Sequence, residues 1–167
     1  NRNKVNTRHE RGVPLQRGEY HLVVGVWVMN ADHRILVTKR HPDKPWGGYW
    51  ECTGGSVVAG ESSVMSAMRE LREETGLFVR ESDLHFLGTI KYGGWFTDTF
   101  TTRIGWEAGD IVLQPEEVVD YRWVHPEELC RMCREGLVVP FMQEQFYAYR
   151  EQIEALAATE SGMREET

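Results

Sequence analysis

The stretch GGSVVAGESSVMSAMRELREETGL, residues 54–77, decides the fold, because it joins a glycine-containing loop to an amphipathic, glutamate-rich segment. Ser62 or Ser63 is suited to cap the first turn of a helix, and Gly76 is a typical helix stop. Apolar positions recur at helical spacing, at Val64, Ala67, Met68 and Leu71. We therefore predict a helix that begins at Ser62 or Ser63 and ends before Gly76.

Three glutamates of this helix, Glu70, Glu73 and Glu74, are spaced so that they share one helix face. Like charges at this spacing destabilise a helix by about 0.2–0.5 kcal/mol per pair. A bound divalent cation reverses that effect, and Mg²⁺ prefers oxygen ligands, commonly a few carboxylates together with substrate phosphates. The spacing therefore indicates a cation platform whose carboxylates converge, with a solvated acidic surface as the alternative.

The fixed pattern of residues between Gly55 and Leu77 indicates a particular protein family more specifically than the helix pattern alone does. It consists of a glycine, five residues, Glu61, seven residues and then RELREETGL at 69–77. Every fixed position of the Nudix box is matched, so the chain resembles the Nudix hydrolases. The resemblance implies an α/β fold, an α/β/α sandwich around a mixed β-sheet. It also implies hydrolysis of a diphosphate linked to another moiety, with Mg²⁺ or Mn²⁺ held by the box.

The resemblance also implies which residues hold the metal. Glu73 and Glu74 are expected to be core ligands, and Glu70 is expected to be a ligand or the base that activates water. The carbonyl of Gly54 is expected to supply a further oxygen. Phosphoryl transfer suits such a platform, because it needs charge neutralisation and alignment more than covalent help from the protein.

Other residues are expected to support the box or the substrate. The resemblance implies that Arg69 orients the glutamates by ion pairing and that Glu61 braces the loop or contacts the metal network, with Gly55 as the first fixed position of the box. Lys39 and Arg40 end a predicted strand near the box and are candidates for phosphate binding, with an ordinary surface charge as the alternative.

One branch of the family is the most similar. The segments YHLVVGVWVMNADHRILVTKR, DKPWGGYW and EEVVDYRWVHPEEL resemble the isopentenyl-diphosphate isomerase type of Nudix domain. That isomerase has Cys-Gly-His where residues 54–56 are Gly-Gly-Ser, and Cys52 lies two positions earlier. His21 matches one of its metal-binding histidines, but Pro14 stands in place of another. We therefore predict a hydrolase; the isomerase and a non-catalytic nucleotide-binding Nudix domain are the alternatives.

A further carboxylate is expected from LQPEEVVD, residues 113–120. Glu117 aligns with a metal-binding glutamate of the isomerase branch, so we predict that it is an extra ligand or the base, with a solvated loop acid as the alternative. Adjacent residues leading into a strand point to opposite sides, so Glu116 and Glu117 cannot both face the box helix.

The substrate stays open between a nucleoside di- or triphosphate, a nucleoside diphosphate linked to another group, and another diphosphate. Trp46, Tyr49 and Trp50 are interpreted as packing under their loop, with base stacking as the alternative. Tyr92 is interpreted as a strand aromatic, although a tyrosine there is loosely associated with dinucleoside polyphosphate hydrolases.

Length and charge restrict the remaining possibilities. A chain of 167 residues fits one domain, and a net charge of −7 argues against a broad basic face for nucleic acid. We expect a small-molecule diphosphate partner, no nucleic-acid polymer, no membrane and a possible homodimer. Three cysteines, an odd number, favour a reducing cytoplasm, and Cys130 and Cys133 are interpreted as ordinary helical residues.

The remaining patterns predict the order of the elements. We expect an N-terminal arm or hairpin over 1–19, the Nudix domain over 20–157 and a disordered tail over 158–167. Strands are predicted at 20–30, 34–40, 49–55 and 121–125, with a hairpin over 83–108 that turns at Gly93-Gly94. Helices are predicted at 126–135 and 141–157.

Overall fold

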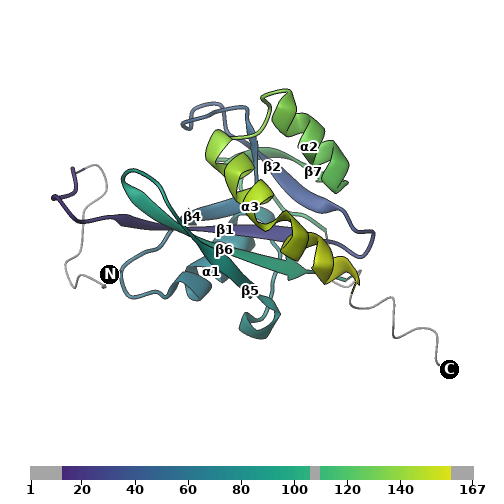
Figure 1. Cartoon of the computed structure of the whole chain (residues 1–167), viewed down its shortest axis with the longest axis horizontal. Coiled ribbons are helices and arrows are strands. Elements are labelled where there is room, and N and C mark those ends of the chain that lie inside the picture. Colours follow the sequence, from purple (N-terminus) through teal and green to yellow (C-terminus); the bar gives the residue numbers. More distant parts are fainter. Residues whose placement is uncertain (1–12, 106–109, 159–167) are drawn as a thin grey trace.

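The computed structural model describes residues 13–105 and 110–158. Most of the predicted arm and of the predicted tail therefore lies outside the described residues. Figure 1 shows the elements, which are β1 (His21–Met29), β2 (Ile35–Arg40), β3 (Trp50–Glu51), β4 (Thr53–Ser56), α1 (Ser63–Thr75), the 3₁₀ turn η1 (Glu81–Asp83), β5 (His85–Lys91), β6 (Trp95–Arg103), β7 (Val118–Val124), α2 (Pro126–Arg134) and α3 (Pro140–Ala158).

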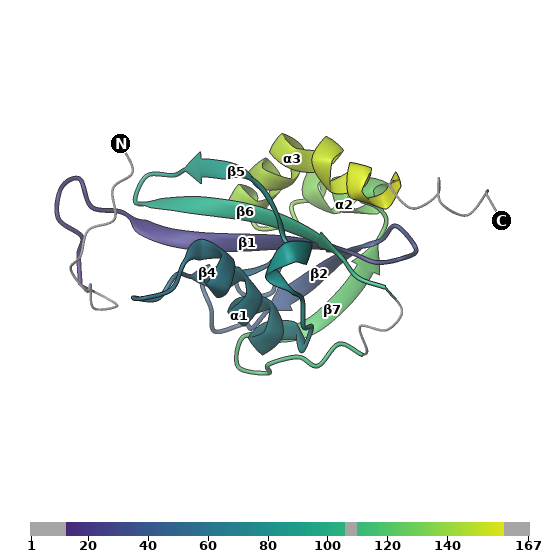
Figure 2. The ribbon, with the colours of Figure 1, turned by 90° about the horizontal axis from the view of Figure 1, so that it is seen from below.

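The strands form one mixed sheet. Its order is β3-β2-β1-β6-β5, and β4 also pairs with β1 while β7 pairs with β2. β1 and β6 run parallel, from His21 opposite Trp95 to Met29 opposite Arg103, and the other described pairs are antiparallel. Figure 2 shows α1 on one side of this sheet and α2 and α3 on the other. The predicted α/β/α sandwich around a mixed sheet is confirmed.

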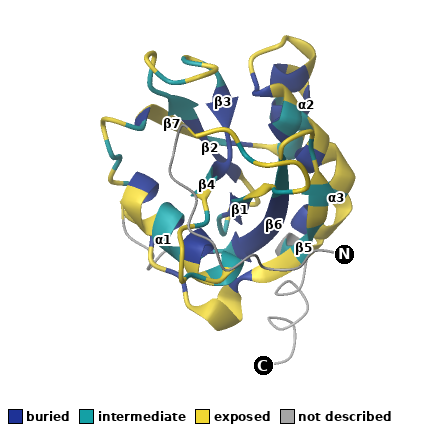
Figure 3. Cartoon of the chain, turned by 90° about the vertical axis from the view of Figure 1, so that its left-hand side faces the viewer, coloured by how far each residue is buried: buried dark blue, intermediate teal, exposed yellow. Residues whose placement is uncertain are grey.

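The central strand β1 fills both layers of the core. Val24, Val26 and Val28 are buried in a cluster that includes residues of α1. Trp27 and Met29 are buried in a second cluster that includes residues of α2 and α3. This strand therefore reads as a continuous apolar run, since both of its faces are covered. Figure 3 shows the buried strands between the exposed outer surfaces of the helices.

Helix α1 begins and ends where its capping chemistry predicts. The Ser62 hydroxyl accepts a hydrogen bond from the backbone N–H of Met65 at 3.2 Å. Gly76 adopts the left-handed conformation, φ 74°, and its N–H donates to the carbonyl of Arg72 at 2.9 Å. Leu71 is fully buried, which stabilises the docked helix by roughly 1.5–3 kcal/mol. These contacts fix the register of the helix and hence the positions of its glutamates.

Two predicted strands differ from the structure. The single strand predicted at 49–55 is divided at Cys52, because β3 pairs with β2 whereas β4 pairs with β1. The strand predicted at 121–125 begins earlier, at Val118, and pairs with β2 across an irregularity between Lys39 and Arg40. Both corrections come from pairing with distant strands, which local periodicity does not encode.

The other predicted elements are present. The hairpin closes through a hydrogen bond from Tyr92 N to the Trp95 carbonyl at 2.8 Å, around Gly93-Gly94. Its second strand ends at Arg103, and residues 106–109 lie outside the described part. Across residues 13–105 and 110–158, no helix combines the length and apolar character needed to span a membrane.

Candidate active site

Gly55 allows α1 to lie directly against β4, and Gly54 allows β4 to lie close against β1. A Cβ at Gly55 would overlap the carboxyl group of Glu70, and a Cβ at Gly54 would overlap the carbonyl oxygen of Val24. Gly54 and Gly55 belong to β4, where they pair with Gly25 and Val24 of β1. The absence of a side chain at Gly55 therefore brings the Glu70 carboxylate next to the backbone of β4.

Arg69 connects the loop to the helix. Its guanidinium donates to Glu61, with 3.0 Å from Nε to Oε1, and to the carbonyl of Ser56 at 3.1 Å. It also pairs with Glu70 at 2.8 Å and with Glu73 at 3.0 Å, the i,i+4 contact expected from the sequence. Hydrogen bonds from Arg69 and Ser66 lower the pKa of the Glu61 carboxyl. One cation thus compensates three carboxylates of the box.

Glu74 is buried and has almost no compensation. Only 3% of the residue is exposed, and its carboxylate accepts one long hydrogen bond, from the N–H of Gly54 at 3.4 Å. Burial, followed by repulsion from Glu51, raises the pKa of Glu74 from 4.5 to about 8. A buried carboxylate with so little compensation is the chemical setting that a divalent cation would stabilise.

Glu70 of α1 faces β4, with its carboxyl group against Gly55. Its side chain is 14% exposed, and burial raises its pKa although Arg69 opposes the shift. Repulsion from Glu73 and Glu117 adds to the rise. Glu117, far away in sequence, therefore comes close enough to Glu70 for their charges to interact.

Of the three acids at positions 116, 117 and 120, Glu117 is the one that pairs with Lys44 and lies within electrostatic reach of Glu70. Its carboxylate forms an ion pair with Lys44, whereas Glu116 and Asp120 are exposed. Its backbone carbonyl accepts a hydrogen bond from His41 N at 2.9 Å, which ties the start of β7 to the loop at 41–48. Glu116 and Glu117 lie in a turn before β7, so the strand alternation expected for them does not apply. The role of Glu117 as ligand or base stays a prediction.

The two candidate phosphate-binding residues have structural partners. Arg40 forms a buried ion pair with Glu51 and donates from Nε to the carbonyl of Pro45 at 2.8 Å. The ammonium of Lys39 lies 5.7 Å from the ring centroid of Trp50. Their role toward phosphate stays a prediction. The sequence analysis missed Glu51 and Lys44, whose only signals were a charge in a strand and a cation in a loop.

The aromatic residues near the site pack mainly within the protein. Trp50 is 5% exposed in the core, as interpreted from the sequence. Trp46 remains 46% exposed and meets Tyr49 edge-on at 5.3 Å between centroids. Tyr92 stacks on Trp95 at 5.1 Å between ring centroids, but it lies just after the end of β5, in the turn of the hairpin, and not in the strand itself.

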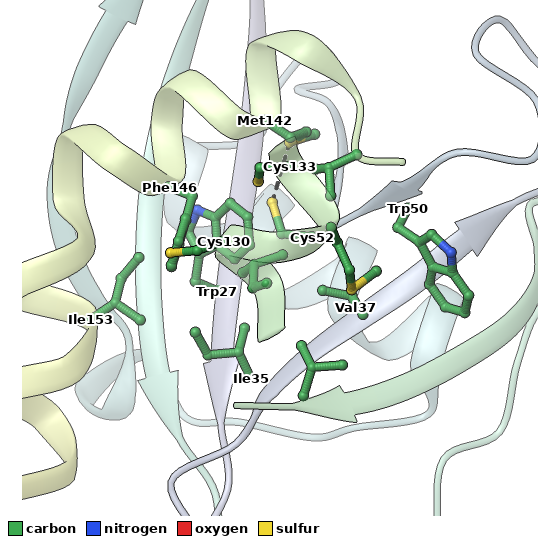
Figure 4. Close-up of a cluster of buried hydrophobic side chains, with 14 of the residues drawn as sticks. Trp27, Ile35, Val37, Trp50, Cys52, Cys130, Cys133, Met142, Phe146 and Ile153 are labelled. Atoms are coloured by element: carbon green, nitrogen blue, oxygen red, sulfur yellow. Dashed lines mark hydrogen bonds between the residues drawn. The ribbon is translucent and has the colours of Figure 1, made fainter. Parts of the chain in front are cut away.

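The cysteines lie in the core on the side of α2 and α3 (Figure 4). Cys52 is fully buried with its Sγ 3.3 Å from Sδ of Met142, and burial raises its pKa well above 9.0. Cys130 and Cys133 are buried and free, in agreement with their interpretation as helical residues. Cys52 is therefore a poor proton donor and acceptor for a ligand at the surface.

The expectation that the three helix carboxylates converge is only partly met. Glu70 and Glu73 share Arg69, whereas Glu74 turns toward Gly54. Within the described residues, no three His, Cys, Asp or Glu side chains are grouped as a ready metal cage. The donor set nevertheless fits a hard cation, because all of its donors are oxygens and Glu74 is buried and forms no ion pair in the described part of the chain.

A family model described as the NUDIX domain matches residues 19–148. The chain belongs to the Nudix hydrolase family. The predicted family is thereby confirmed, and the box of this Nudix protein is the site built around Arg69 and Glu74. The finer resemblance to the isomerase branch stays a prediction.

The Nudix chain is similar to several characterised and uncharacterised proteins. It is 35% identical over 143 residues to an uncharacterized Nudix hydrolase from Listeria innocua, covering 84% of this chain and 85% of that protein. It is 32% identical over 142 residues to an RNA pyrophosphohydrolase from Novosphingobium aromaticivorans, covering 73% and 84%. A solved structure of the NUDIX domain of Shewanella oneidensis NrtR with ADP-ribose aligns at a TM-score of 0.65 and 20% identity, covering 80% and 88%. That structural likeness shows the shared fold.

Proposed function

We propose that this Nudix protein is a metal-dependent pyrophosphohydrolase that uses Mg²⁺, or Mn²⁺, to cleave the diphosphate linkage of a nucleoside diphosphate joined to another group, or of a related substrate. The observation that carries the proposal is Glu74, whose buried carboxylate lies beside a glycine backbone and forms no ion pair within the described residues. Membership of the Nudix hydrolase family supports the reaction class.

The proposed metal site consists of Glu70, Glu73, Glu74 and the carbonyl of Gly54. Glu74 is the anchor, because its burial and its raised pKa make a cation the favoured replacement for its proton. Glu70 and Glu73 remain in reach of Arg69, which holds both side chains in one orientation. When bound, the metal supplies charge neutralisation at phosphate and a lower pKa for the attacking water.

The remaining roles belong to the protein's own residues. Glu117 or Glu70 accepts the proton of the attacking water. Burial, together with repulsion from Glu73 and Glu117, raises the pKa of Glu70 and so makes it a stronger base. Gly55 and Glu61 keep the loop and helix in register through the close approach to Glu70 and the pairing with Arg69. Lys39 and Arg40 end β2, which pairs with β3, and both remain candidates for binding the phosphate groups of the substrate.

The substrate proposal draws support from the relatives. One relative is named an RNA pyrophosphohydrolase, and the NrtR domain was solved with ADP-ribose, so relatives act on or bind nucleotides. A net charge of −7 favours a small substrate over a long polyanion. Three free cysteines support a reducing compartment such as the cytoplasm.

The buried state of Cys52 supports hydrolysis over isomerisation. An isomerase of the similar branch requires a cysteine that exchanges a proton with carbon, and the Cys52 thiol is in the core against Met142. Purified protein incubated with isopentenyl diphosphate and Mg²⁺ is therefore expected to yield no dimethylallyl diphosphate.

The deciding experiment is a Mg²⁺-dependent assay against a panel of substrates. The panel contains nucleoside triphosphates, ADP-ribose, dinucleoside polyphosphates and non-nucleotide diphosphates, and both products of each reaction are identified. We expect wild type to turn over at least one substrate of the panel, and we expect this activity to be lost in Glu74→Gln and in the presence of EDTA. Tight binding of a nucleotide without turnover would instead favour the non-catalytic alternative.

A further inference from the structure

Lys44 is a cation that lies among several carboxylates of the site. Its ammonium pairs with Glu117, and its side chain is 23% exposed. Its positive charge also lowers the pKa of Glu51 and of Glu74, against the larger effect of burial at each. A single ammonium therefore lies within electrostatic reach of three carboxylates that come from three different elements.

The loop that carries Lys44 is built to hold it there. Lys44 N donates to the carbonyl of His41 at 3.0 Å, and the next residue, Pro45, accepts the Nε hydrogen bond of Arg40. Further along, Trp46 takes the left-handed conformation at φ 59°. Hydrogen bonds therefore restrain the backbone at Lys44 and at Pro45, and the conformation of the loop positions the ammonium.

We propose that Lys44 is a built-in counter-cation, which neutralises Glu117 and its neighbours while metal is absent and competes with a divalent cation for their negative charge. This inference rests on the proposed metal-dependent function. A divalent cation that binds beside this ammonium is repelled by it, so the two compete for the same negative charge. The ammonium therefore weakens metal binding to the free protein, so that metal is held firmly only together with the negatively charged diphosphate.

The test measures Mn²⁺ binding to the protein without any substrate, from the electron paramagnetic resonance signal of free Mn²⁺. Lys44→Met and Lys44→Gln are expected to bind Mn²⁺ more tightly than wild type, on the order of tenfold. Lys44→Arg keeps the charge and is expected to bind as wild type does. Lys91→Met is the matched control for net charge, because the Lys91 ammonium contacts Tyr20 instead of a carboxylate of the site.

A double-mutant cycle separates the local pair from a general charge effect. If Lys44 acts through Glu117, removal of Lys44 in a Glu117→Gln background should gain much less Mn²⁺ affinity than in wild type. An equal gain in both backgrounds would overturn the competition at Glu117.

The outcomes for the two proposals are distinguishable. If wild type and Glu74→Gln bind Mn²⁺ equally weakly, both the metal platform and the role of Lys44 are overturned. If Glu74→Gln weakens Mn²⁺ binding while both neutral Lys44 variants bind no tighter than wild type, only the Lys44 proposal is overturned. Tighter binding by the neutral variants, with Lys91→Met unchanged, is the result that the proposal requires.

Discussion

Two adjacent glutamates of α1 have different surroundings. The Glu73 side chain is 50% exposed and pairs with Arg69, whereas Glu74 is buried against β4. Burial strengthens every electrostatic interaction of Glu74, because the surroundings screen its charge less than water does. Glu74 should therefore contribute more to a bound cation than Glu73 does.

Replacing either glutamate by glutamine should remove most Mg²⁺-dependent activity and leave the fold intact, with the larger loss in Glu74→Gln. The substitution keeps the shape and removes one charge, so metal-free thermal stability should hold or rise. Activity at several Mg²⁺ concentrations and thermal unfolding in EDTA measure both effects. Full activity in both variants would disprove the metal platform.

Glu117→Gln should reduce activity more than Glu116→Gln or Asp120→Asn, because Glu117 is the one of these acids that pairs with Lys44 and lies within electrostatic reach of Glu70. Loss of a general base costs roughly 10²–10⁴-fold in rate. If Glu117 is only a metal ligand, raised Mg²⁺ should recover much of the loss. A Glu117→Gln rate within about threefold of wild type, below the usual range for a general base, would move that role to Glu70.

The residues of the site were predictable where their neighbours are close in sequence. The Arg69–Glu73 pair follows from i,i+4 spacing. The alternation expected at Glu116 and Glu117 does not apply, because both lie in the turn before β7. The Lys44–Glu117 pair joins residues that are 73 positions apart. No local pattern encodes such a contact, so the sequence indicated Glu117 but missed its partner.

Among the elements, the C-terminal end of α1 can be tested by replacing Gly76, with Gly60 as a control. Both glycines have a positive φ. A Cβ at Gly76 would lie 3.0 Å from Cβ of Val112, whereas a Cβ at Gly60 would meet nothing within 4 Å. Both alanine variants should lose about 1–2 kcal/mol from the backbone alone. Gly76→Ala should lose more, because it also displaces the segment at Val112.

Urea unfolding of the two variants measures the difference. Gly60→Ala, with φ +95° at the wild-type glycine, controls for the backbone cost. Equal losses would show that the segment at Val112 adjusts freely and does not help to position α1.

Helices and strands were predictable from the sequence where a local pattern of side chains is enough to specify the element. The apolar run of β1 and the capped helix α1 are examples. The division between β3 and β4 was not predictable, because the choice of pairing partner depends on the assembled sheet. The early start of β7 has the same cause, since Val118 pairs with Arg40.

At the scale of the whole molecule, the metal-free protein should become less stable between about pH 4.5 and 8, since burial raises the pKa of Glu74 from 4.5 to about 8. The folded protein retains this proton where the unfolded chain has lost it, so ionisation of Glu74 disfavours folding. The effect is on the order of 3–5 kcal/mol. Thermal unfolding across this range in EDTA measures it.

Glu74→Gln is the control for this pH dependence. The variant has no titrating group at that position, so most of the decline should disappear. Saturating Mg²⁺ should also offset the decline in wild type, because the cation replaces the proton. A wild-type stability that rises over the same pH range would contradict the assignment of Glu74 as the buried acid.

The central claim is that water attacks phosphorus at this site with the help of a divalent metal. The most direct measurement is hydrolysis of the best substrate of the panel in ¹⁸O-labelled water with Mg²⁺, followed by mass spectrometry of both products, for wild type and Glu74→Gln. Wild type should give one ¹⁸O atom on a phosphate product, with no reaction in EDTA and little in Glu74→Gln. Turnover by Glu74→Gln at the wild-type rate, or ¹⁸O incorporated on carbon, would contradict it.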